Sequence, residues 1–212
     1  MKLFSRGWAS AAFLLALVSA GFQVAQAQVK PPGARYPSTK DDAEFMQGMI
    51  GHHAQAIIMA GWAPSHGASP SVQIMCARIV LSQSTEIKLM QDWLKVRGFP
   101  VPDSTGKMPM DHANMAGMHH AAMAHDSLMP GMLDDYQMKL LDGARGASFD
   151  RLLLTFMIQH HEGALVMVDK LFKSAAGGQD DDIFKFATAV HADQTSEIDR
   201  MKSMLAGGGL RF

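Results

Sequence analysis

Apolar residues recur at helical spacing along four long stretches of the chain, which cover residues 41–61, 71–96, 149–174 and 180–205. One face of the first stretch is formed by Asp42, Phe45, Met49, His53 and Ala56. The third stretch repeats this face with Asp150, Leu153, Met157, His161 and Ala164. A shorter helical pattern covers residues 133–144, and no stretch shows the alternation of a β-strand. The pattern predicts an all-α protein.

Glycine and proline separate these stretches, at residues 64–70, 98–102 and 177–178. The second stretch should face inward with Cys76, Ile79, Gln83, Ile87, Met90 and Leu94, and the fourth with Ile183, Phe186, Val190, Gln194, Ile198 and Met201. Four amphipathic helices with such stripes are typical of a four-helix bundle.

An internal repeat relates the two halves of the chain. Residues 49–59 and 157–167 both read Met-x-x-His-His-x-x-Ala-x-x-Met, and an Asp precedes each copy at the same offset. A Gln-x-x-Glu-Ile motif follows each copy, at residues 83–87 and 194–198. The repeat predicts two equivalent helical hairpins related by a pseudo-twofold axis, which would bring His53 and His161 into equivalent core positions. His52 should point toward the edge of its face or a neighbouring helix.

The N-terminal residues have the features of an export signal. Lys2 and Arg6 precede a short apolar run, and residues 25–27 form an Ala-x-Ala cleavage site. We therefore expect a signal peptide at 1–27, export to the periplasm, and no membrane span after cleavage. The domain prediction continues with an extended leader (28–40), a bundle (41–205) and a flexible tail (206–212). Within the bundle we place repeat one at 41–97, a linker at 98–132 and repeat two at 133–205.

Charge and cysteine content limit the classes of partner. Without Lys2 and Arg6 the chain has 17 basic and 20 acidic residues, so nothing in the charge balance favours nucleic acid. No polybasic block marks an anionic membrane surface. Cys76 is the only cysteine, which excludes an intrachain disulfide and is typical of a small core residue.

Two interpretations fit the paired histidines. Imidazole binds copper, zinc, iron and nickel, and Met49 with His53 and Met157 with His161 are i,i+4 pairs on one helical face. His52 and His160 complete the candidate ligands of the core. Alternatively, His53 and His161 form a buried hydrogen-bond network with Glu86, Glu197, Asp42 or Asp150.

The linker contains many of the 18 methionines and ten histidines of the chain, without a helical face that would bury them. Its candidate ligands are Met108, Met110, His112, Met115, Met118, His119, His120, Met123, His125, Met129 and Met132. Closely spaced thioethers can converge on Cu(I), and the histidines also suit Cu(II). The alternative is a solvated linker in which the methionines have no ligand.

The doubled histidine motif, the following Gln-x-x-Glu-Ile and the Met-Pro-Gly-Met segment at 129–132 resemble those of a bacterial family of secreted helical proteins, domain of unknown function 305. The resemblance covers approximately residues 41–205 and implies a ferritin-like four-helix bundle. Some members are periplasmic copper-binding proteins that take part in copper resistance. By position, the resemblance implies a role for Met49, His52, His53, Met157, His160, His161 and the Met/His segment.

We therefore expect a periplasmic protein that sequesters copper or transfers it to other copper-handling proteins. In this hypothesis Cu(I) binds to thioethers, with Met129 and Met132 near the mouth of the bundle. One alternative is a redox enzyme with a metal in the core, and another is a metal-free interaction module whose histidines fix the helices. The sequence does not determine the metal's oxidation state, the stoichiometry or the oligomeric state.

Overall fold

The computed structural model describes residues 36–108 and 128–208. The predicted signal peptide at 1–27, residues 28–35 of the predicted leader and the predicted ligands between Met110 and His125 lie outside these ranges. The described helices are α1 (Lys40–Gly61), α2 (Pro70–Val96), α3 (Asp135–Gly143), α4 (Gly146–Lys173) and α5 (Asp181–Ser203), and a π-helical turn, η2 (Met204–Gly208), continues α5. No strand occurs in the described ranges, so this part of the chain is all-helical as predicted.

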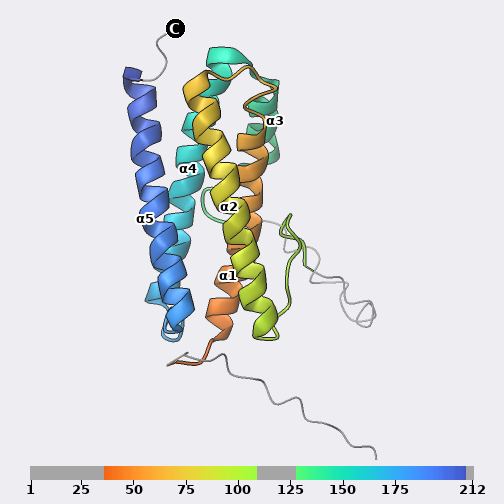
Figure 1. The fold of residues 1–212 in the computed structure, drawn as a ribbon, viewed down its shortest axis with the longest axis vertical. Coiled ribbons are helices and arrows are strands. Elements are labelled where there is room, and N and C mark those ends of the chain that lie inside the picture. The colour runs from red at the N-terminus through yellow and green to blue at the C-terminus, as the bar shows by residue number, and fades with distance from the viewer. Residues whose placement is uncertain (1–35, 109–127, 209–212) are drawn as a thin grey trace, which may run out of the picture.

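Four long helices lie side by side, and the short α3 lies beside one end of them (Figure 1). Helix α1 packs on α2 and on α4, and α4 packs on α5. The predicted hairpins α1–α2 and α4–α5 therefore meet through their first helices. The ferritin-like classification and the pseudo-twofold axis remain predictions, although equivalent residues of the two hairpins make several equivalent contacts.

The helix boundaries follow the capping signals in the sequence. Thr39 is the N-cap of α1 and forms a reciprocal capping box with Asp42. Asp134 and Gln137 form the same arrangement at α3, so that helix begins at Asp135 instead of Leu133, which is buried in the core. Helix α4 begins at Gly146, earlier than the predicted Phe149.

Asp42 and Asp150 do not contact the histidines, which corrects one part of the network interpretation. The Oδ1 atom of Asp42 accepts a hydrogen bond from the backbone N–H of Gly178, at 2.7 Å, in the turn between α4 and α5. Asp150 accepts from the backbone N–H of Ser69, at 3.1 and 3.2 Å, in the turn before α2. Each carboxylate thus fixes the turn of the opposite hairpin.

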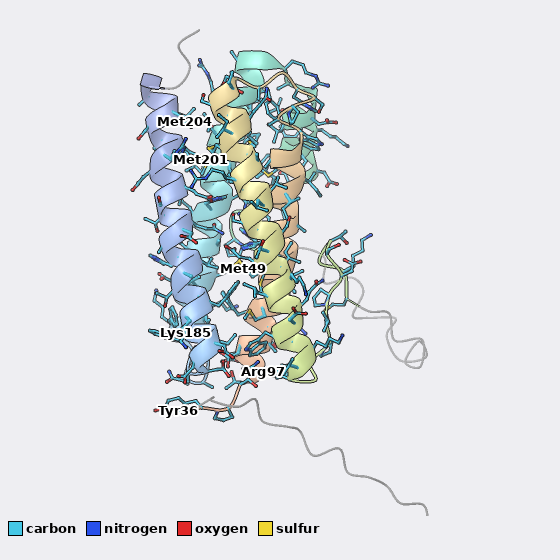
Figure 2. All side chains as sticks on the ribbon, in the orientation of Figure 1. Tyr36, Met49, Arg97, Lys185, Met201 and Met204 are labelled. Atoms are coloured by element: carbon cyan, nitrogen blue, oxygen red, sulfur yellow. The ribbon has the colours of Figure 1, made fainter. Side chains whose placement is uncertain are left out.

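A polar layer divides the hydrophobic core into two clusters. On α1, one cluster takes residues between 43 and 50 and the other takes residues from 56 onward. The same division occurs on α2, α4 and α5. Between the clusters lie six buried polar residues, which we call the polar layer: His52, His53, Gln83, His160, His161 and Gln194. Met49, labelled in the middle of Figure 2, belongs to the cluster that contains the start of α1.

Candidate metal-binding layer

The polar layer places its four histidines inside the bundle, each with a fully buried side chain. Helical spacing explains His53 and His161, which lie on the inward faces of α1 and α4. His52 and His160 are each one residue earlier and lie where α1 packs on α4. The expectation that His52 points to a neighbouring helix is therefore met, and its ring is fully inside the protein.

His53 and His161 make equivalent hydrogen bonds to glutamates of the Gln-x-x-Glu-Ile motifs. The Nε2 atom of His53 lies 2.6 Å from Oε2 of Glu86, and that of His161 lies 2.7 Å from Oε2 of Glu197. Glu86 and Glu197 are partly exposed, at 19% and 25% of their side-chain surface. Each carboxylate therefore connects a buried imidazole to the solvent-facing edge of the bundle.

His52 and His160 form the centre of the layer. Their ring centroids are 3.8 Å apart with an interplanar angle of 39°. Burial lowers the pKa of His52 to about 3, against the hydrogen bond to the Pro130 carbonyl, which raises it. Burial and then the neighbouring His52 lower the pKa of His160 well below its usual range. Both rings are thus neutral at physiological pH, the form in which imidazole binds a metal.

Within the described part of the chain, several ring nitrogens of the layer have no hydrogen-bond partner. They are Nδ1 of His52, Nδ1 of His53, Nδ1 of His161 and both nitrogens of His160. A contact with the backbone of His52 raises the pKa of His160 but lacks the geometry of a full hydrogen bond. In His52, His53 and His161 the other nitrogen, Nε2, is engaged by a carbonyl or carboxylate. A neutral ring whose Nε2–H is donated keeps a lone pair on Nδ1, so each of these rings presents a bare acceptor inside the protein.

Residues 128–133 form a strap that runs over α1 and α4. The strap carries the Pro130 carbonyl to Nε2 of His52, at 3.0 Å. The amide of Gln55 pairs with both backbone groups of Leu133, at 2.8 and 2.9 Å. Gly163 makes room for the strap, because a Cβ there would collide with the Pro130 carbonyl. The strap, at the end of the linker, therefore contacts the polar layer through a hydrogen bond between residues 78 positions apart.

The predicted methionine ligands divide into three groups. Met49 and Met157 are fully buried within the two apolar clusters and act as core residues. Met108 is exposed, and Met129 and Met132 are partly buried on the strap. The others, and all the linker histidines, lie outside the described residues.

The described side chains do not form a preassembled metal site of the usual kind. Within residues 36–108 and 128–208, no group of three or more His, Cys, Asp or Glu side chains is arranged to hold a metal ion.

None of the described helices is long and apolar enough to cross a membrane. Two participants, the Pro130 carbonyl and Gln55, were not predicted from the sequence, because both act through the strap.

Comparisons with known proteins agree with this fold. A crystal structure of a DUF305 fragment from Deinococcus radiodurans superposes with a TM-score of 0.62 at 25% identity, covering 80% of this chain and 98% of that one. A DUF305 protein from Streptomyces coelicolor, thought to be secreted, superposes with a TM-score of 0.61 at 25% identity, covering 78% of this chain and 92% of that one. CopM in its Cu(II)-bound form superposes with a TM-score of 0.56 at 26% identity, covering 78% of this chain and 95% of that one.

Sequence comparison adds a partial relative and the family itself. The uncharacterized protein L153 of Acanthamoeba polyphaga mimivirus is 35% identical over 57 residues, which is 27% of this chain and only 38% of that protein. The family profile described as Domain of unknown function (DUF305) matches residues 42–205, from the aspartate that caps α1 to the turn after α5. The chain belongs to the DUF305 family.

Proposed function

We propose that this protein binds copper in the periplasm and either stores it or transfers it to other copper-handling proteins. The observation that carries the proposal is the set of bare imidazole nitrogens in the polar layer. A buried polar atom without a partner is costly, at about 1–3 kcal/mol. Coordination of a metal ion by two of these nitrogens would satisfy both of them, with thioethers or linker side chains as further ligands.

The hydrogen bonds around the layer fit histidines that act as metal ligands. Such histidines usually donate the second ring N–H to a carboxylate or carbonyl, which fixes the ring and makes the free nitrogen more basic. His53 with Glu86, His161 with Glu197 and His52 with the Pro130 carbonyl have this arrangement. The low pKa of His52 and His160 keeps both rings deprotonated and available to a cation.

The donor types favour copper over harder metals. Imidazole suits copper in both oxidation states, and the thioethers of Met129, Met132 and the linker favour Cu(I). CopM, whose fold this chain shares, has been crystallised with Cu(II). Export through the predicted signal peptide would place this binding outside the cytoplasm.

The test is a titration of the protein with Cu(I) against a competing chelator, repeated with Cu(II). The first variant combines His52→Gln with His160→Gln, and the second lacks residues 109–125. We expect weaker copper binding from the histidine variant and a lower stoichiometry from the deletion. His191→Gln, on the exposed surface of α5, is the control. Absence of copper uptake by the unmodified protein would contradict the proposal, and unchanged binding by the deletion variant would exclude the linker.

A second candidate function is a metal-free helical module in which the histidines only fix the helices. The two His–Glu hydrogen bonds favour it, because they satisfy one nitrogen of each ring without any ion. Thermal unfolding separates the two functions. A copper-binding protein should unfold at a higher temperature with copper, since a ligand of the native state stabilises it. The metal-free module should be indifferent to copper but less stable after His161→Ala.

A redox enzyme with a resident metal in the core is tested by a different measurement. Metal analysis of the protein purified without added copper would find a stoichiometric metal if the core holds one permanently. A storage or transfer protein prepared in the same way would contain little copper and would take it up on titration.

A further inference from the structure

A pocket separate from the polar layer opens between α1 and α4 beside the strap. Its volume is about 290 Å³. The residues that matter for its chemistry are Asp41, Glu44, Gly48, Met129, Met167 and Lys170. Met167 is the last residue of the repeated histidine motif and was not among the ligands predicted from the sequence.

Two methionine side chains meet over Gly48, which has no side chain of its own. A Cβ placed on Gly48 would lie 3.3 Å from Sδ of Met129 and 3.4 Å from the terminal methyl of Met167. The methyl of Met129 lies 3.4 Å from the equivalent point on Gly51, one turn further along α1. The side chains of Met129 and Met167 therefore both reach the space above Gly48, and both line the same pocket.

Core packing accounts for only part of the Met167 side chain, which packs against the apolar cluster that contains the start of α1. The counterpart of Met167 in the first repeat, Met59, is fully buried within an apolar cluster. Met167 is only partly buried and lines an open pocket. A partly exposed thioether can be oxidised, and leucine would supply similar apolar volume without a sulfur. The feature that distinguishes Met167 from Met59 is access to solvent through the pocket.

The strap holds Met129 in this position. The next residue, Pro130, gives its carbonyl to His52, and Gln159 donates to the Gly131 carbonyl at 3.3 Å. The backbone around Met129 is therefore attached to both α1 and α4. A soft-metal site needs its sulfurs near one another before the ion arrives, because ordering free side chains would reduce the affinity.

We propose that Met129 and Met167 bind a soft monovalent cation, Cu(I) or Ag(I), in this pocket. The inference deepens the proposed copper binding by assigning it a site and an oxidation state. Thioethers are neutral and polarizable, and they select Cu(I) over hard cations. Linear two-coordination is common for d¹⁰ cations of this kind, so two sulfurs are a sufficient set. The charges around the pocket nearly balance, because Glu44 pairs with Lys40 at 3.1 Å and Asp41 is matched by Lys170, so selection of the cation would come from the sulfurs.

The experiment uses the full protein labelled with ¹³C in its methionine methyl groups and titrated with Ag(I), a redox-inert analogue of Cu(I). Met129→Leu and Met167→Leu assign the two resonances. Gly48→Leu then fills the pocket without removing either sulfur. Its helical position tolerates a side chain, since Gly48 is not among the glycines with positive φ. Gly61→Leu, where a Cβ meets no atom within 4 Å, and Met59→Leu, at the counterpart of Met167, are the matched controls.

We expect the Met129 and Met167 methyl resonances to shift together with Ag(I) and to stop responding in Gly48→Leu, while the two controls behave like the unmodified protein. A circular dichroism melt of each variant confirms that it is folded. If other methionine methyls respond and these two do not, the site is wrong but copper binding survives. If no methionine responds and Cu(I) titration also finds no uptake, the proposed function fails together with the site.

Discussion

The imidazole ring of His52 lies against that of His160, with centroids 3.8 Å apart, at the centre of the interface between α1 and α4. Two protonated rings could not occupy this position, because each would place a charge beside the other in a solvent-free layer. The lowered pKa of both rings agrees with this requirement. The bundle therefore keeps two neutral imidazoles at its centre, with apolar clusters above and below.

The metal-free protein should lose stability as the pH falls from 7 to 5. In the unfolded chain His52 titrates at its ordinary pKa of 6.5, whereas in the folded protein the pKa is about 3. The unfolded state therefore binds more protons between these values, and stability falls as the pH is lowered through that window. Each such histidine contributes a slope of about 1.4 kcal/mol per pH unit below 6.5. Urea unfolding at a series of pH values measures the slope.

A variant comparison identifies the source of that slope. His52→Gln with His160→Gln should flatten the dependence of the unfolding free energy on pH between 7 and 5. His191→Gln should leave it unchanged, because that side chain is exposed on α5. A slope equally steep in the double variant would show that other groups cause the acid sensitivity.

Removal of Glu86 or of Glu197 should lower the stability by the same amount, because each makes an equivalent hydrogen bond to a histidine of the polar layer. Glu86→Ala leaves Nε2 of His53 without a partner, and Glu197→Ala does so for His161. We expect each to lower the unfolding free energy by about 1–3 kcal/mol. If the layer binds copper, each should also weaken that binding by about 10–100-fold. Glu162→Ala, which removes an exposed pair with Lys202, is the control, and very different results for the two glutamates would contradict the equivalence of the hairpins.

Helical periodicity was sufficient to predict much of this arrangement. The inward faces of α1 and α4 were correct residue by residue, because a 3.6-residue period fixes which side chains share a face. The same period left His52 at the edge of its face. Periodicity alone could not show that α1 packs on α4 as well as on α2, and that the packing on α4 buries His52. The partners of Asp42 and Asp150 were missed for a similar reason, since both are turns of the opposite hairpin.

The strap shows the limit of sequence reasoning more clearly. The segment at 129–132 was recognised as a motif, but its chemistry was assigned to the two methionine sulfurs. Its contact with the layer is a backbone carbonyl, which every residue has and no side-chain pattern reveals. Gly163 could have suggested it, because a helix-interior glycine often marks a close approach of another backbone.

Gly163→Ala should therefore weaken the polar layer, although Gly163 is not one of its residues, by displacing the strap. The added Cβ would collide with the carbonyl of Pro130 and the Cα of Gly131, which are backbone atoms that cannot turn aside. The strap would lift, and His52 would lose its hydrogen bond. We expect a loss of unfolding free energy of about 1–3 kcal/mol. Gly61→Ala meets open space and should be neutral or slightly stabilising. Chemical denaturation measures both, and a neutral Gly163→Ala would show that the strap moves freely.

The crossed contacts of Asp42 and Asp150 lead to a prediction about how the two hairpins are held together. Asp42→Ala leaves the buried N–H of Gly178 unpaired and also removes half of the α1 capping box, while Asp150→Ala leaves the partly buried N–H of Ser69 unpaired. Each should cost about 1–3 kcal/mol. The two turns lie at opposite ends of the bundle (Figure 1), so the losses should add in the double variant.

Asp169→Ala is the control for these two variants, because it removes only an exposed i,i+4 pair with Lys173. Its effect should stay below about 0.5 kcal/mol. Equilibrium denaturation of the four variants measures the sum directly. If the double variant loses much less unfolding free energy than the sum of the single losses, the two turns open together. Loss of either carboxylate alone would then be enough to separate the two hairpins.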